Sequence, residues 1–246
     1  MSAQPATQEE TVVAVPRQRA APVKPPPLEN GDHLTREEFE RRYWAMPDVN
    51  KAELIEGVVY MPTPVGHSRH SRPHGIIATW LGVYCASTPG VDWGDNSSVR
   101  IDIGNEFQPD MLLRLEPSAG GKSRIGEDDS VEGPPELVVE VAASSTSLDL
   151  HTKMRVYRRN GVREYVVWRV LECQLDWFLL SPGDTVRLTP NEAGVVCSGV
   201  FPGLCLAVGA LLESDMATVL AELRKAMQIP EHEAFAQSLQ EARSPA

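Results

Sequence analysis

Two acidic residues stand where a metal-dependent enzyme could use them. Asp110 follows Pro109 at the start of an expected strand, and Glu140 interrupts the apolar run Glu136 to Ala142 (ELVVEVA). A carboxylate inside an apolar strand is strongly disfavoured unless it is protonated or has a cation as its partner. Carboxylate oxygens suit Mg²⁺ or Mn²⁺, so the pair predicts a divalent-cation site. The alternative is that Asp110 caps a turn and Glu140 forms a structural ion pair with an arginine.

Two further groups of side chains suggest other chemistry. His67, His70 and His74 stand three and four residues apart, a spacing that could place zinc ligands on one helical face. Pro73 falls between them and no cysteine joins them, so solvated histidines are the alternative. A basic cluster is a candidate for nucleic-acid contact, with a solvated surface as its alternative. It comprises Arg155, Arg158 and Arg159, with Arg163 beyond.

The elements around these residues predict a mixed α/β fold. The run 136–142 is typical of a strand buried on both faces, a helical pattern follows over 145–159, and Asn160-Gly161 supplies its stop. A strand over 162–170 would complete a right-handed crossover unit, and 173–180 would pair with it as a hairpin. Other expected elements are helices near 35–46, 71–86 and 215–227, strands over 52–61, 98–103 and 109–115, and a mobile loop over 118–133.

We expect three regions along the chain. Residues 1–31 are rich in proline and cannot build a core, 32–213 form the folded domain, and 214–246 form a last helix and a polar tail. The hairpin carries more apolar residues than one small core readily covers, which predicts a homodimer. These residues are Trp168, Leu175, Trp177 and Phe178.

Composition limits the partners. The 246 residues carry 42% hydrophobic side chains and a net charge of −11, which weakens broad binding to nucleic acid or acidic membranes. No apolar run is long enough to span a membrane and the N-terminus lacks a signal pattern, so a cytoplasmic location is expected. The four cysteines, with no Cys-x-x-Cys pair, are interpreted as small buried apolar residues rather than disulfide partners.

Several motifs in order carry a family resemblance. They are ELIEG (53–57), His74 with Ile77 and Leu81, QPDMLL (108–113), ELVVEVAASST (136–146), DLHTK (149–153) and YRRNGVREYVVW (157–168). Together they resemble a large bacterial restriction endonuclease family, whose short proteins carry the PD-(D/E)xK nuclease fold. The resemblance covers roughly residues 34–213. The chain departs from the family pattern at Ala143-Ser144, where Ser-Pro is usual, and at Val166 and Arg169 in the later strand.

The resemblance implies a restriction-endonuclease-like mixed sheet flanked by helices, with an added hairpin region. It implies a metal held by Asp110 and Glu140, a helix-borne lysine at Lys153, and an acidic position near the metal at Glu53. In such folds the lysine usually stands two residues after the second acid, where this chain has Ala142. Lys153 shares a helical face with Asp149 and could reach back over the strand, although an ordinary surface ion pair with Asp149 is the alternative. If Lys153 is catalytic, Lys153→Ala should lose cleavage with little change in melting temperature.

The function expected is therefore that of a Mg²⁺- or Mn²⁺-dependent endonuclease that hydrolyses phosphodiester bonds of DNA. Asp110, Glu140, Lys153 and Glu53 would form its catalytic site. One alternative is a binding or regulatory module that keeps the nuclease fold without strong catalysis, and another is a zinc hydrolase built on the histidines. Duplex DNA, single strands and RNA all remain open as substrates.

Overall fold

The computed structural model describes residues 24–62, 66–143 and 145–243. Its helices are α1 (Arg36–Tyr43), α2 (Arg72–Ser87), α3 (Met154–Asn160), α4 (Val208–Leu212), α5 (Met216–Ala226) and α6 (Pro230–Arg243). A π-helical turn precedes α2 (η1, His67–Ser71) and α3 (η3, Leu148–Lys153), and short 3₁₀ turns are η2 (Pro117–Ala119) and η4 (Val170–Glu172). Of the proline-rich residues 1–31, residues 1–23 lie outside the described part, as does Ser144.

Two mixed six-stranded sheets contain most of the strands. One sheet runs β2-β1-β5-β4-β8-β7 and the other β12-β11-β10-β9-β6-β3, while β13 and β14 form a separate pair. The strands are β1 (Glu53–Ile55), β2 (Val58–Tyr60), β3 (Val91–Asp95), β4 (Val99–Asp102), β5 (Asn105–Phe107), β6 (Met111–Leu115), β7 (Arg124–Ile125), β8 (Val131–Glu132), β9 (Leu137–Ala142), β10 (Glu164–Arg169), β11 (Gln174–Ser181), β12 (Asp184–Arg187), β13 (Val195–Cys197) and β14 (Cys205–Ala207).

The central crossover is as expected from the sequence. Strands β9 and β10 are parallel, with Glu140 beside Val167, and η3 and α3 connect them and end at Gly161, whose φ of 91° is left-handed. Strand β11 returns antiparallel to β10 as a hairpin. The mixed α/β class is therefore confirmed. Separately, no helix among the described residues is long and apolar enough to cross a membrane.

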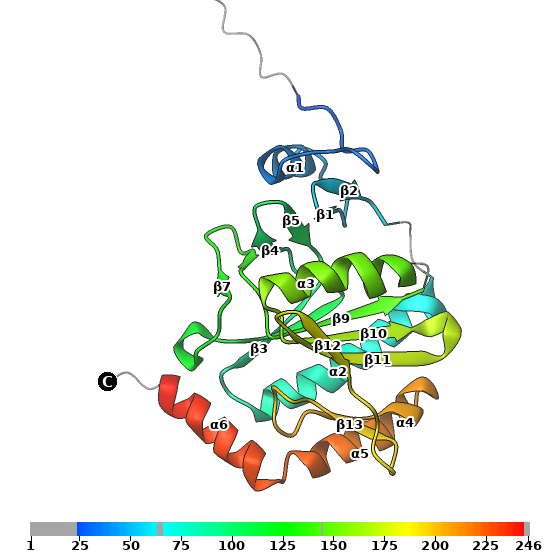
Figure 1. The fold of residues 1–246 in the computed structure, drawn as a ribbon, viewed down its shortest axis with the longest axis vertical. Coiled ribbons are helices and arrows are strands. Elements are labelled where there is room, and N and C mark those ends of the chain that lie inside the picture. Colours follow the sequence, from blue (N-terminus) through cyan, green and yellow to red (C-terminus); the bar gives the residue numbers. More distant parts are fainter. Residues whose placement is uncertain (1–23, 63–65, 144, 244–246) are drawn as a thin grey trace, which may run out of the picture.

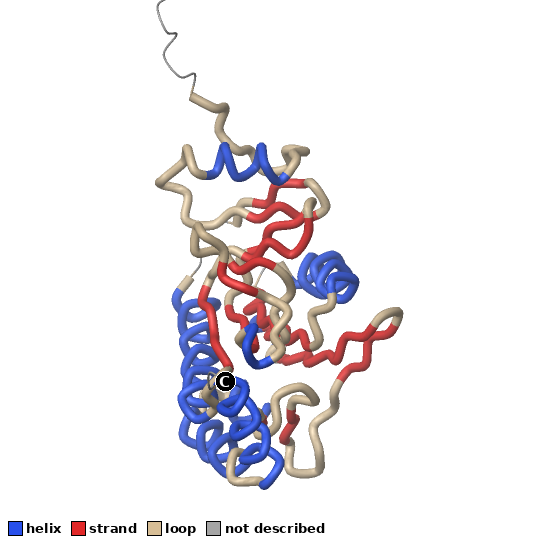
Figure 2. The backbone as a smooth tube through the Cα atoms, turned by 90° about the vertical axis from the view of Figure 1, so that its left-hand side faces the viewer, coloured by secondary structure: helices blue, strands red, loops and turns tan. Residues whose placement is uncertain are grey.

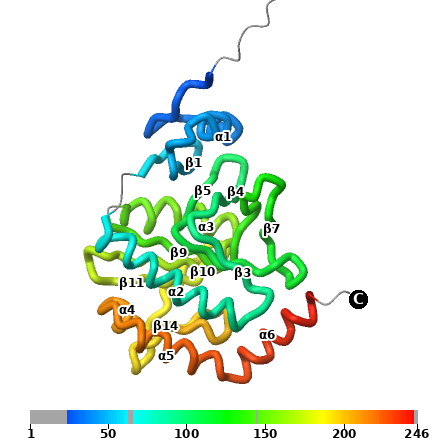
Figure 3. The backbone as a smooth tube through the Cα atoms, turned by 180° about the vertical axis from the view of Figure 1, so that it is seen from behind, coloured from blue at the N-terminus to red at the C-terminus, as the bar shows by residue number. Residues whose placement is uncertain are grey.

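Two apolar cores lie on opposite faces of β9, because successive side chains of a strand alternate between its faces. Val139 and Val141 pack in a core that includes α2 and the C-terminal helices, whereas Val138 and Ala142 pack in a core with Val156 and Tyr157 of α3. Figure 1 shows α3 in front of the central sheet, and Figure 3 shows α2 on the opposite side. Glu140 thus points to the α3 side.

The amino-terminal part forms a small unit above the central sheet. Figure 2 shows α1 and the first strands stacked at one end of the molecule. Thr35 caps α1 by accepting a hydrogen bond from the Glu38 backbone N–H, three residues along the chain. Leu28, Phe39 and Leu54 are buried together in a third core, so packing begins before residue 32.

Some expectations fail. The hairpin residues Trp168, Leu175 and Trp177 are buried within one chain by segments that include α5 and α6, and Phe178 packs against the other core. One chain thus covers the apolar side chains that suggested a homodimer, and the homodimer itself stays a prediction. Residues 118–133 are not simply a loop, because β7 and β8 pair there.

The carboxyl-terminal region also differs from expectation. Residues 230–243, expected as a polar tail, form α6, which buries His232 and Leu239. The cysteines were expected to be unpaired, but Cys197 and Cys205 form a disulfide. The reason is their register, since the two residues face each other directly across the β13–β14 pair. Cys173 is exposed rather than buried.

Candidate active site

A cleft of about 1210 Å³ lies where the amino-terminal unit meets the central sheet. Its walls come from distant parts of the chain: the segment before β1, the η1 turn, the start of β6, the end of β9, and η3. Four of the side chains that line it were expected from the sequence or the family resemblance, namely Glu53, Asp110, Glu140 and Lys153. The structure therefore brings the four expected catalytic residues together.

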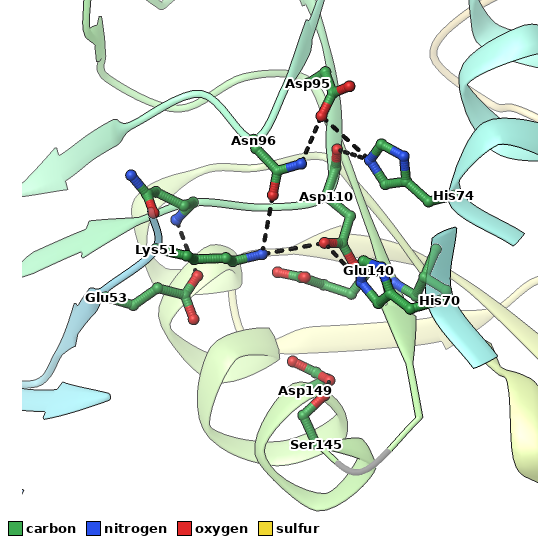
Figure 4. A network of polar contacts seen from close by, with 12 residues as sticks. Lys51, Glu53, His70, His74, Asp95, Asn96, Asp110, Glu140, Ser145 and Asp149 are labelled. Atoms are coloured by element: carbon green, nitrogen blue, oxygen red, sulfur yellow. Dashed lines mark hydrogen bonds and ion pairs between the residues drawn. The ribbon is translucent and has the colours of Figure 1, made fainter. Parts of the chain in front are cut away.

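Asp110 lies directly before β6 and is held there by several contacts. Its Oδ2 accepts a hydrogen bond from the Val141 backbone N–H at 2.8 Å, which ties it to β9 beside Glu140. Its Oδ1 lies 3.1 Å from Lys51 Nζ and 3.2 Å from His70 Nε2, as Figure 4 shows. Burial opposes ionisation, but the hydrogen bond with His70 and the charge of Lys51 outweigh it and hold the pKa of Asp110 well below its ordinary value.

Glu140 is more costly to ionise than Asp110. It is 3% exposed, and its Oε1 lies 3.0 Å from Lys153 Nζ and 3.4 Å from the Tyr157 hydroxyl that donates to it. Burial raises the pKa of Glu140 to about 8 despite the charge of Lys153, and the neighbouring carboxylates, Asp149 first, add to the rise. The negative charge around Glu140 is thus incompletely balanced by the protein.

Lys153 reaches back over the strand, as its helical position predicts. Its ammonium lies 2.8 Å from Glu53, 3.0 Å from Glu140 and 3.5 Å from Asp149. Burial lowers the pKa of Lys153, but these carboxylates outweigh it and raise that pKa well above its ordinary value. The pair of Asp149 and Lys153 is buried, so its interpretation as a surface pair is wrong.

Glu53, the first residue of β1, links the two sheets. Its Oε1 accepts hydrogen bonds from the Gln108 backbone N–H at 2.9 Å and from Lys153 at 3.0 Å. The side chain is buried. Glu53 therefore orients Lys153 and fixes the chain just before Asp110.

Lys51 is the main functional candidate that sequence reasoning missed. Its ammonium donates to Asp110 Oδ1 at 3.1 Å and to Asn96 Oδ1 at 3.3 Å. Burial lowers the pKa of Lys51, but Asp110, Glu140 and Glu53 together outweigh it and raise that pKa. Its spacing from Glu53 could have identified it, because residues two apart on an extended segment point to the same side.

The histidines join the carboxylate site. The rings of His70 and His74 stack with centroids 5.8 Å apart. His70 faces Asp110, while His74 contacts Asp95 at 3.2 Å and the Asp110 backbone carbonyl at 3.0 Å; His67 is exposed. Within the described residues, no group of three or more His, Cys, Asp or Glu side chains could hold a metal ion. The zinc site expected of the three histidines is therefore not formed there.

The donor set nevertheless fits a magnesium-type cation. Mg²⁺ commonly takes only one or two protein carboxylates and completes its shell with water and substrate oxygens. Asp110 and Glu140 supply two carboxylates that line one cleft. Four carboxyl groups at this site (Glu53, Asp110, Glu140 and Asp149) face two ammonium groups, Lys51 and Lys153. Full ionisation of the four would leave an excess of negative charge that a divalent ion would balance.

The arginines expected to contact nucleic acid lie elsewhere on α3. Arg155 and Arg159 each form a 2.7 Å ion pair with Glu56, and Arg158 donates to the Thr185 hydroxyl. None of the three is among the described residues that line the cleft. The structure thus gathers the acidic residues and Lys153 into one site and leaves these arginines outside it.

Known proteins show the same fold. A family model named Uma2, described as "Putative restriction endonuclease", matches residues 36–209. A solved structure described as a putative nuclease belonging to DUF820 from Anabaena variabilis is similar to this chain with a TM-score of 0.53 at 13% sequence identity. That match covers 70% of this chain and 96% of the other. At this identity the match indicates a common fold, and function depends on the site. No curated protein matches this chain.

Proposed function

The chain belongs to the Uma2 restriction endonuclease family, and from that premise we propose that it is a metal-dependent endonuclease that hydrolyses phosphodiester bonds of DNA. One observation supports the proposal. Asp110, just before β6, and Glu140, in the neighbouring strand β9, line the same cleft. Asp110 also accepts a hydrogen bond from the residue next to Glu140. Two carboxylates fixed in this way are suited to a shared cation.

Each residue has a distinct part in the proposed reaction. Asp110 and Glu140 would hold Mg²⁺ or Mn²⁺, and the cation would supply a water of lowered pKa and offset charge on the phosphate. Lys153 and Glu53 keep Glu140 in place through their ion pairs. The oxygen of a water forms a bond to phosphorus while one ester P–O bond breaks. The proton lost by the water ends on the leaving oxygen, giving a phosphate monoester and an alcohol.

The decisive experiment is a cleavage assay on supercoiled, linear and single-stranded DNA with Mg²⁺ or Mn²⁺. We expect the parent protein to cleave at least one of them, and Asp110→Asn to lose roughly a hundredfold or more, the scale for removing one group that stabilises charge in the transition state. Equal cleavage by Asp110→Asn would point to a contaminant. No cleavage by the parent would favour a nuclease-fold binding module instead.

The cytoplasmic location expected from the sequence remains a prediction.

Cation binding can be measured separately from cleavage. Titration calorimetry with Mn²⁺ should show much weaker binding by Glu140→Gln than by the parent, because one of two charged oxygen donors is lost. The same change should leave the fold intact, since it removes a carboxylate that burial disfavours. If Glu140→Gln binds Mn²⁺ as tightly as the parent, the cation does not lie at this pair.

A further inference from the structure

The two lysines of the site, Lys51 and Lys153, differ in how exposed their ammonium groups are to the cleft. Lys153 has three ammonium hydrogens to donate and three carboxylates around it: Glu53, Glu140 and Asp149. Its side chain is 4% exposed. Its ammonium donates hydrogen bonds to Glu53 and Glu140, and a buried group surrounded by carboxylates in this way is closed to a substrate.

Lys51 is open to the cleft. Its side chain is 23% exposed, and within the described residues it donates to two oxygens, on Asp110 and Asn96. One N–H of its ammonium therefore remains for a ligand. Figure 4 shows the side chain extended across the site, with its nitrogen beside Asp110.

The backbone under Lys51 is well fixed. The next residue, Ala52, donates its N–H to Gln108 Oε1 at 3.2 Å, and β1 begins one residue later, paired with both β2 and β5. Gln108 is also the residue that binds Glu53. Lys51 and Glu53 are thus anchored to the segment that carries Asp110, which keeps the ammonium at a set place beside the proposed cation ligands.

We propose that Lys51, and not Lys153, is the amine that contacts the phosphate of the nucleic-acid substrate. Lys153 is then a positioning residue that holds the two glutamates. This inference rests on the proposed function, because it assigns the phosphate contact within the same site. An ammonium placed against a non-bridging phosphate oxygen stabilises the charge that builds up there during hydrolysis. The competing explanation is that Lys51 serves only to neutralise Asp110.

Oligonucleotide binding separates these explanations without requiring cleavage. The full-length protein is titrated with a short fluorescein-labelled DNA, single-stranded and duplex, in Ca²⁺ over a series of salt concentrations. Lys51→Met should weaken binding roughly tenfold and reduce the salt dependence by about one phosphate contact, whereas Lys51→Arg should preserve that contact. Lys153→Met should leave the salt dependence as in the parent. Lys122→Met, at an exposed lysine outside the cleft lining, is the matched control for charge alone.

The outcomes are distinct. Binding by Lys51→Met with the parent's affinity and salt dependence would overturn the inference, as would a parent protein that binds neither DNA. So would loss of the phosphate contact in Lys153→Met but not in Lys51→Met. The proposed function is judged independently by cleavage with Asp110→Asn. A protein that binds through Lys51 but never cleaves would uphold this inference and refute the hydrolysis.

Discussion

Lys153 is a buried cation, and replacing it should reduce the stability of the fold as well as the activity. Replacing it with methionine leaves Glu53, Glu140 and Asp149 buried around no positive charge. Breaking a buried ion pair from one side typically costs about 3 to 5 kcal/mol, so Lys153→Met should lower the melting temperature by roughly 10 °C. The burial of these ion pairs therefore revises the prediction for Lys153→Ala, for which a lower melting temperature is now expected as well.

A second substitution tests that explanation. Adding Glu53→Gln to Lys153→Met removes one of the stranded carboxylates and should recover part of the lost melting temperature. Calorimetry of the four proteins in this cycle gives the coupling directly. Simple additivity of the two single changes would mean that Lys153 stabilises the fold by packing and not by charge.

Glu106 provides a prediction for pH. It lies buried on β5, and burial, reinforced by Glu40, raises its pKa to about 7 although Arg100 opposes this. A carboxyl group with a raised pKa in the folded state stabilises the fold below its unfolded pKa, near 4.5, and loses that contribution as pH rises through 7. Between pH 5 and pH 8, denaturant unfolding should therefore show Glu106→Gln gaining about 2 to 3 kcal/mol relative to the parent. Glu127→Gln, on the exposed surface, should follow the parent; a similar trend in both would exclude Glu106 as the cause.

At this scale the sequence predicted the acidic residues better than the amines. Glu140 was found because a charge inside an apolar strand is unusual. Lys153 came from the family resemblance, supported by a helical spacing that carries it back toward that strand. Lys51 was missed, since a lysine before a short strand has the pattern of an ordinary surface residue. Its function depends on Asn96 and Asp110, which are far away in the sequence.

Among the elements, α6 and its docking site offer a direct test. Gly90 has a φ of 100°, and an added Cβ there would lie 2.9 Å from Leu239 Cβ on α6. Gly90→Ala should therefore destabilise the protein by about 1 to 3 kcal/mol through strain and overpacking. Gly209→Ala is the control, because Gly209 lies in α4 with nothing within 4 Å of the added atom. That change should be neutral or slightly stabilising in thermal unfolding; equal losses in both would show that α6 does not pack as described.

Long, periodic elements were predictable and short or polar ones were not. The capping residue Thr35, the apolar helix α2 and the valine-rich β9 each follow from local pattern. By contrast, α6 has few apolar residues to mark its face, with only His232 and Leu239 buried. Strands β7 and β8 have two residues each, too few for any alternation to appear. Strand β8 also pairs with β4, which lies far away in the sequence.

For the whole molecule, the distribution of charge limits how nucleic acid can bind. The net charge is −11, and Arg155 and Arg159 are occupied by Glu56. Three lysines and arginines are among the described residues that line the cleft. Arg69 is exposed and Lys51 is partly exposed, whereas Lys153 is buried. With a negative net charge and these two accessible cations in the described cleft lining, the protein should rely on the cleft for affinity and not on a broad basic surface.

This arrangement predicts a shallow salt dependence. Each phosphate neutralised on duplex DNA contributes about −0.9 to the slope of log K against log salt, so two cations imply a slope near −2. Fluorescence anisotropy with a labelled duplex across a salt series measures it. The double variant Arg155→Gln/Arg159→Gln should keep the parent's slope, because neither arginine lines the cleft and both are held by Glu56. A slope reduced by about two in that variant would instead mean that the DNA displaces Glu56 and runs along α3, which would enlarge the binding surface well beyond the site around Asp110.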